Sequence, residues 1–179
     1  MNEPLESTII YLDGPAERRQ VVRQISALRQ HMREFTASIP SEQWYEPRYD
    51  GLTLAAILGH LNFSDNMGLM LLKMAQLGLR PATSERMLKR VNRLTIFLFR
   101  RRLIQASLQG MAHNQNRIID YVLSLPIDQM SKSVWNPARQ HFTTIEKGLQ
   151  EFFIHHWQHH LAQIEAVEGM TPSQRSDNI

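Results

Sequence analysis

The sequence predicts an all-α protein, an up-down-type four-helix bundle with an extra short helix before the third main helix. Two observations support this fold class. Apolar residues recur with the 3.6-residue period of a helix over long stretches, and only eight glycines and eight prolines interrupt the 179 residues. No stretch reads convincingly as a strand. We expect one domain, residues 1–179, with a flexible polar tail at 170–179.

The first two main helices have clear start signals. Pro15 suits the first turn of a helix that extends to about residue 38 and carries apolar side chains along one side. The segment "IPSEQW" ends this helix. After a polar and aromatic loop, Thr53 can cap a second helix that extends to about Leu77.

The third main helix has two possible readings. Residues 84–125 could form one continuous helix, but a short helix at about 84–96 followed by a longer one at about 99–124 fits the pattern better. In either reading the helix ends before Pro126, because the residue that precedes a proline disfavours helical backbone angles.

The fourth main helix follows the loop that ends in "HFTTIEKGLQ". Thr143 or Thr144 provides the N-terminal signal, and the helix extends to about Glu168. Gly169 and Pro172 then end it.

The composition excludes several kinds of site and partner. The chain has no cysteine, which rules out disulfides and cysteine-ligated metals and fits a cytoplasmic protein. The opening "MNEPLESTII" does not resemble an export signal, and no apolar stretch approaches the roughly 18–20 residues that span a bilayer. A net charge of +3 without a nucleic-acid-reading motif gives no reason to expect nucleic acid as a partner.

Four of the eight histidines lie close together in "FFIHHWQHHLAQIE", residues 152–165. Because each residue advances about 100° around a helix, they cannot share one face. His156 and His160 fall in the middle of an apolar stripe and should face inward. The stripe contains Leu149, Phe153, Ile164 and Val167. His155 and His159 should face solvent or a neighbouring subunit.

Two histidines one helical turn apart can bind one metal ion, but sites of this kind usually take three protein ligands. His60 is the best third candidate, because it lies within the apolar stripe of the second helix. The pattern therefore predicts a metal site of His60, His156 and His160. The alternative for each histidine is a core residue that bonds a carbonyl or hydroxyl group.

The motifs around these histidines resemble those of a known family. "GLTLAAILGHLNFSDN" and "EFFIHHWQHHLAQIE", with H-x-x-x-H followed by x-x-Q-I, resemble the DinB/YfiT-like four-helix bundles, and the resemblance covers nearly the whole chain. It implies a divalent metal held by His60, His156 and His160, with one coordination position open. It also implies a thiol-dependent S-transferase or a metal-dependent hydrolase. The chain departs from the family in lacking an acidic residue near "LAAIL" and in its basic "RRR" at 100–102.

Ligation by histidine alone suits Zn, Ni, Cu or Fe, among which affinity order does not choose, and we expect a divalent ion such as Zn or Ni. Three neutral imidazoles leave the ion its full charge, so a water or thiol would lose its proton more readily. Without cysteine in the chain, a sulfur nucleophile would be a low-molecular-weight thiol acting on a small-molecule substrate. Gln163 and Ser64 could orient substrate or bond a ligand histidine, or could be ordinary packing residues.

A basic segment, residues 86–102, leaves a second function open. It combines seven basic residues with leucine, isoleucine and phenylalanine. Such a segment could bind phosphate, an anionic cofactor or a membrane surface, although a solvated basic face is the favoured reading. The alternative function is thus a non-catalytic metal-binding or interaction bundle with an anionic partner. Apolar faces such as "LTIFLF" would suit a homodimer.

Overall fold

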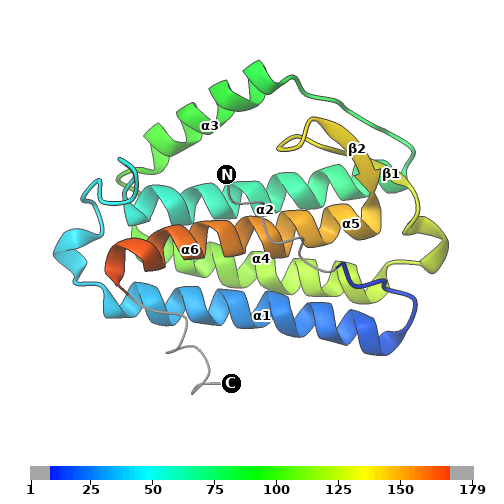
Figure 1. Ribbon diagram of the computed structural model, residues 1–179, viewed down its shortest axis with the longest axis horizontal. Helices are drawn as coiled ribbons and strands as arrows, with labels where there is room; N and C mark the ends of the chain where they lie inside the picture. Colours follow the sequence, from blue (N-terminus) through cyan, green and yellow to red (C-terminus); the bar gives the residue numbers. More distant parts are fainter. Residues whose placement is uncertain (1–8, 170–179) are drawn as a thin grey trace.

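The computed structural model describes residues 9–169, so the predicted tail at 170–179 lies outside the described residues. Four long helical stretches pack side by side (Figure 1). They are α1 (Pro15–Ser38), α2 (Leu54–Gln76), α4 (Ile104–Ser124) and a C-terminal run composed of α5 (Ile145–Gln150), a π-helical turn (Glu151–His155) and α6 (His156–Glu168). None of the helices within residues 9–169 is long and apolar enough to cross a lipid bilayer.

The extra helix, α3 (Glu85–Phe99), lies outside the four-helix frame and packs mainly against α2. It carries the chain back to the end of the bundle where α2 begins. As a result α2 and α4 run in the same direction, and α1 and α6 run opposite to both (Figure 1). Two short 3₁₀ helices, Ser41–Gln43 and Ile127–Gln129, lie in the loops.

The predicted helix boundaries are confirmed to within a few residues. The Thr53 and Thr144 side chains cap α2 and α5 by accepting the backbone N–H groups of Ala56 and Lys147. The reading of residues 84–125 as one helix is wrong, because the chain leaves the helix after Phe99 and begins α4 only at Ile104.

The expectation that the chain contains no strands is also wrong. β1 (Ser133–Asn136) and β2 (His141–Thr144) pair as an antiparallel hairpin, with Ser133 opposite Thr144. Strands of four residues are too short to show a convincing alternation in the sequence. The Asn136 side chain holds the turn, since its oxygen accepts the backbone N–H groups of Ala138 and Arg139 at 3.0 and 3.2 Å.

A buried ion pair joins three of the helices at the centre of the bundle. Both nitrogen–oxygen distances from Arg29 Nη2 of α1 to the Asp65 carboxylate of α2 are 3.2 Å, and both side chains are 0% exposed. The Trp157 indole donates to Asp65 at 2.8 Å, while the guanidinium lies 4.1 Å from the centre of the Trp157 ring. Arg29 also donates to the Phe153 carbonyl at 2.8 Å. Burial raises the pKa of Asp65 to about 6, and Arg29 opposes that shift.

The contact between α3 and α2 depends on a glycine. A Cβ atom added to Gly59 would lie 2.5 Å from the Cβ of Phe99, so only glycine allows the end of α3 to approach α2 this closely. Gly110 of α4 is different, because an added Cβ would make only an ordinary contact, 3.4 Å from the Asn62 side-chain oxygen.

Arg29→Met should lower the free energy of unfolding by about 3–5 kcal/mol at neutral pH, because it leaves the buried Asp65 carboxylate without its cation. Urea denaturation followed by circular dichroism measures the change. The matched control is Lys89→Met, which removes an exposed pair with Glu85 and should change stability little. Equal effects of the two substitutions would contradict the importance given to the buried pair.

Gly59→Ala should destabilise the protein, whereas Gly110→Ala should stabilise it. In a helix interior alanine is favoured over glycine by about 0.5–1 kcal/mol, and Gly110→Ala should show this gain. Gly59→Ala must also displace Phe99, so its melting temperature should fall below that of the natural chain. Thermal unfolding of both variants provides the comparison, and a gain in both would show that α3 is not held as described.

Candidate metal centre

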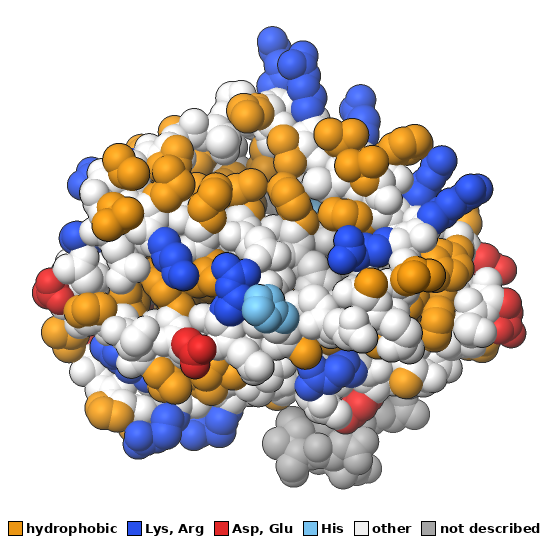
Figure 2. All heavy atoms as spheres, turned by 180° about the vertical axis from the view of Figure 1, so that it is seen from behind, with side chains coloured by type: hydrophobic (Ala, Val, Ile, Leu, Met, Phe, Trp, Pro, Cys, Tyr) orange, Lys and Arg blue, Asp and Glu red, His pale blue; other side chains and the backbone are white. Residues whose placement is uncertain are grey.

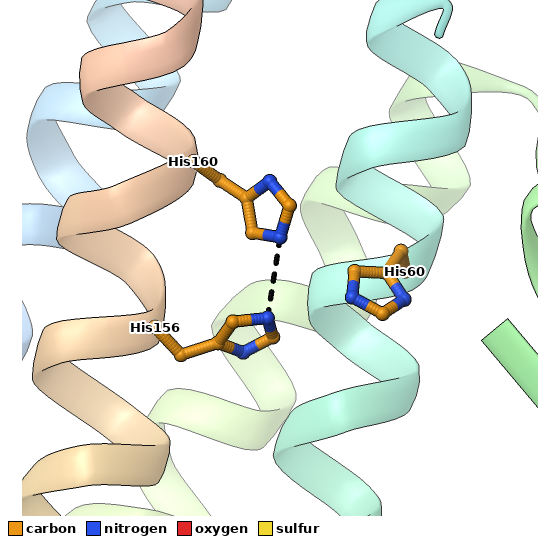
Figure 3. Close-up of side chains that lie close together, drawn as sticks. All are labelled: His60, His156 and His160. Carbon is orange, nitrogen blue, oxygen red and sulfur yellow. Dashed lines mark hydrogen bonds between the residues drawn. The ribbon is translucent and has the colours of Figure 1, made fainter. Parts of the chain in front are cut away.

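The three predicted histidines lie together between α2 and α6 (Figure 3). His60 comes from α2, and His156 and His160 come from successive turns of α6. One ring nitrogen of each lies within 4.8 Å of the corresponding nitrogens of the other two. The two Nε2 atoms of His156 and His160 are 3.2 Å apart, and the His60 ring centre is 5.3 Å from each of the other ring centres. Three potential donor atoms therefore surround one small volume.

The surroundings keep these rings uncharged at neutral pH. Burial lowers the pKa of His60. Burial, with repulsion from His160 and His60, lowers the pKa of His156 well below its usual value. Burial and His60 lower the pKa of His160 to about 4, although a hydrogen bond with Gln163 opposes the shift. Within residues 9–169, no carboxylate forms an ion pair with any of the three rings.

The donor atoms of the three histidines suit a divalent metal ion. Neutral imidazole nitrogens carry free lone pairs, and sites of three histidines suit ions such as Zn or Ni. His60 supplies a further observation, because its Nδ1 is buried and has no hydrogen-bond partner among the described residues. A buried polar atom without a partner is unfavourable in a folded protein.

The two predicted supporting residues lie close to the histidines in different ways. Gln163 Oε1 is 3.2 Å from Nδ1 of His160, and the Gln163 amide donates to Asp50 at 3.0 Å. A hydrogen bond to the outer ring nitrogen of this kind fixes the orientation of a histidine. Ser64, one turn after His60, lines the neighbouring cavity.

A cavity of about 450 Å³ adjoins the histidines. α2, α3, the β1–β2 turn and the π-helical turn enclose it, and His60 and His156 form part of its wall. Most of the lining is apolar and includes Phe63, Met67, Leu71, Leu88, Val91 and Phe152. Arg139 and Glu151, which form an ion pair at 3.3 Å, also line the cavity. The site therefore combines neutral nitrogen donors with space for a largely apolar molecule.

Two of the sequence-based expectations about the C-terminal run need correction. His155, expected to face solvent or a neighbouring subunit, is half-buried and lines the cavity, whereas His159 is exposed as expected and also borders the cavity. A constant advance of 100° per residue fails across the π-helical turn, which has more residues per turn than an α-helix. Val167, expected in the buried stripe, is 42% exposed in the last turn of α6, whereas Leu149, Phe153 and Ile164 are buried as predicted.

The polar residues that hold the helices next to the histidines were not predicted from the sequence. Trp157, next to His156, binds Asp65, which in turn pairs with Arg29. A signal for this pair exists in the sequence, because Arg29 lies between Ile25 and Met32 on the apolar stripe of α1. A charge at such a position indicates a buried partner.

Comparisons with known proteins agree with this architecture. The model of the DinB superfamily matches residues 24–164, a range that contains all three histidines. The solved structure of YfiT from Bacillus subtilis, described as a probable metal-dependent hydrolase with an unusual four-helix bundle topology, has the same fold. It matches with a TM-score of 0.70 and 16% sequence identity over 95% of each chain. None of the curated proteins gives a significant match. Because the family model covers most of the sequence, the chain belongs to the DinB superfamily.

Proposed function

We propose that the protein is a metal-dependent enzyme in which His60, His156 and His160 hold a divalent ion. We further propose that it transfers a low-molecular-weight thiol to a small electrophilic substrate, with hydrolysis as the related alternative. The observation that carries this proposal is the position of three neutral, mutually close imidazoles in and beside the wall of an apolar cavity. A group of inward histidines needed only for packing would not require an adjoining cavity of this size.

The residues of the chain have separable tasks in this proposal. A divalent ion held by three neutral ligands lowers the pKa of a water or thiol that it binds and so supplies a nucleophile near neutral pH. The depressed pKa values of His60, His156 and His160 keep their lone pairs available for an ion. Gln163 orients the His160 ring. Apolar side chains such as Met67 and Phe152 would exclude water from the substrate.

The absence of cysteine restricts the source of sulfur. In the transferase reaction, the thiol loses its proton, its sulfur forms a bond to the electrophilic carbon, and the leaving group departs from that carbon. No residue of the chain can supply this sulfur, so a diffusible thiol must enter the cavity. In the hydrolytic alternative, water takes the place of the thiol.

Metal loading provides the first test. Metal-free protein titrated with Zn²⁺ or Ni²⁺ should bind about one equivalent, and His156→Ala should weaken binding by more than the roughly 10–100-fold that is typical of losing a supporting residue. Elemental analysis and calorimetry measure both. His155→Ala is the matched control, because His155 lines the same cavity but lies outside the triad. Folded natural protein that binds neither ion would refute the proposal.

Activity distinguishes the two reactions. Metal-loaded protein is incubated with low-molecular-weight thiols and apolar electrophiles, or with esters and amides in the absence of thiol. Metal-dependent loss of thiol that disappears in His156→Ala supports the transferase, and thiol-independent cleavage supports the hydrolase. One bound ion with no turnover of either kind would favour the non-catalytic alternative.

The free energy of unfolding of the metal-free protein should decrease as the pH is lowered from about 6.5 to about 4. The pKa of His160 is about 4 in the folded chain and about 6.5 in an unfolded one, so over this interval only the unfolded chain takes up the proton. The associated stability is present above pH 6.5, and roughly 3 kcal/mol of it is lost as the pH falls to about 4.

Urea denaturation in the presence of a chelator measures this pH dependence. His160→Gln should make the curve flatter, because the variant lacks the titrating ring. His113→Gln, on the exposed side of α4, is the control and should leave the curve unchanged. Identical slopes for the natural chain and His160→Gln would contradict the prediction.

A further inference from the structure

We propose that α3 docks the protein onto an anionic lipid surface. The proposed contact is made by the exposed side of α3, which borders the cavity at Met87, and it holds whether or not the triad binds a metal. It explains both the apolar and the basic residues that the proposed enzyme leaves unassigned.

The first observation is a row of exposed apolar side chains. Thr95 is buried where α3 packs on α2, but Met87, Leu94 and Leu98 are 55%, 57% and 60% exposed. At about 100° per residue, these three side chains lie within roughly 40° of one another around the helix. They therefore share one side of the helix, with the partly buried Val91 between Met87 and Leu94, and this apolar strip indicates an interaction surface.

The second observation is the charge beside this strip. Residues 85–102 contain seven basic residues and one acidic residue. The acidic residue, Glu85, pairs with Lys89, and none of the six arginines forms an ion pair with a carboxylate of the described residues. Apolar and basic side chains lie next to one another along the edge of the molecule where α3 lies (top of Figure 2). The helix is thus amphipathic, with an uncovered apolar strip and an unpaired basic face.

An anionic bilayer is the partner that complements both features. Apolar side chains of such a helix enter the boundary between headgroups and acyl chains, while lysine and arginine contact the lipid phosphates. A second copy of the chain, related by two-fold symmetry through α3, would bring two strongly positive faces together. Duplex nucleic acid would contact the arginines but would leave the apolar strip in water. Of these three partners, only the lipid surface complements both sets of side chains.

Docking through α3 would also bring the cavity to the membrane. Met87, Leu88 and Val91 belong to α3 and line the cavity, so an apolar molecule could pass from the bilayer to the histidines over a short path. This consequence rests on the proposed function, whereas the docking itself does not.

Vesicle co-sedimentation of the full chain tests the docking. Binding to vesicles of equal parts phosphatidylglycerol and phosphatidylcholine should be at least tenfold tighter than binding to phosphatidylcholine alone, and added salt should weaken it. The double substitution Leu94→Ser and Leu98→Ser should reduce binding at least tenfold without changing the melting temperature much, because both side chains are exposed. Leu123→Ser is the matched control, since Leu123 is a 49% exposed leucine of α4.

A second pair of variants tests the charge. Arg90→Gln and Arg93→Gln should each weaken binding about fivefold, as expected for one basic residue near an anionic surface. Arg19→Gln and Arg23→Gln, at exposed positions of α1, should leave binding unchanged.

Three outcomes would overturn the proposal. They are equal binding to both kinds of vesicle, full binding by the Leu94 and Leu98 double variant, and a dimer in sedimentation velocity that this variant abolishes while vesicles are not bound. His156→Ala should bind vesicles like the natural chain. Failure of the metal site and failure of the docking are therefore separate results.

Discussion

The arrangement of the candidate site depends on the buried pair of Arg29 and Asp65. Two charges removed from water add little net stability, but one without the other is very unfavourable, so the pair permits few alternative packings of the helices that carry it. Asp65 binds Trp157, and Arg29 binds the carbonyl of Phe153 in the π-helical turn. These contacts hold the C-terminal run three residues before His156 and one residue after it. A contact that includes no histidine thus sets the position of the histidine pair opposite His60.

The candidate site itself contrasts with this support. The pair is charged and fully buried, and hydrogen bonds join its two members, although Nε of Arg29 has no hydrogen-bond partner among the described residues. The three histidines are neutral, and Nδ1 of His60 also has no partner there. Two neighbouring layers of side chains in the bundle, one around Asp65 and one around His60, therefore have different roles. The layer around Asp65 fixes the helices, and the layer around His60 keeps nitrogen lone pairs available beside a cavity.

Much of this organisation is readable from the sequence because the signals are local. Caps such as Thr53 and Thr144 lie at the helix ends that they stabilise, and the spacing of His156 and His160 places both on one face. The structure brings His60 to this pair as its apolar surroundings predict, while the role of the three as metal ligands stays a prediction. The hairpin escaped prediction because its four-residue strands are too short to show an alternating pattern, and the buried pair escaped because its two residues lie far apart in the chain. The π-helical turn has no sequence signal that distinguishes it from the α-helix on either side. Only packing reveals that Arg29 meets Asp65.

Because α3 lies outside the four-helix frame, sequence changes in α3 and changes in the helices that carry the histidines have different effects. Every candidate ligand belongs to α2 or α6, whereas α3 contributes one wall of the cavity and meets the frame mainly along α2. Substitutions, insertions or exchange of this one helix can therefore reshape the cavity without moving a histidine. If the proposed function holds, such a division would allow α3 to set the substrate while the histidines keep their arrangement. In the laboratory, it makes residues 85–99 a natural segment to randomise when a new specificity is sought.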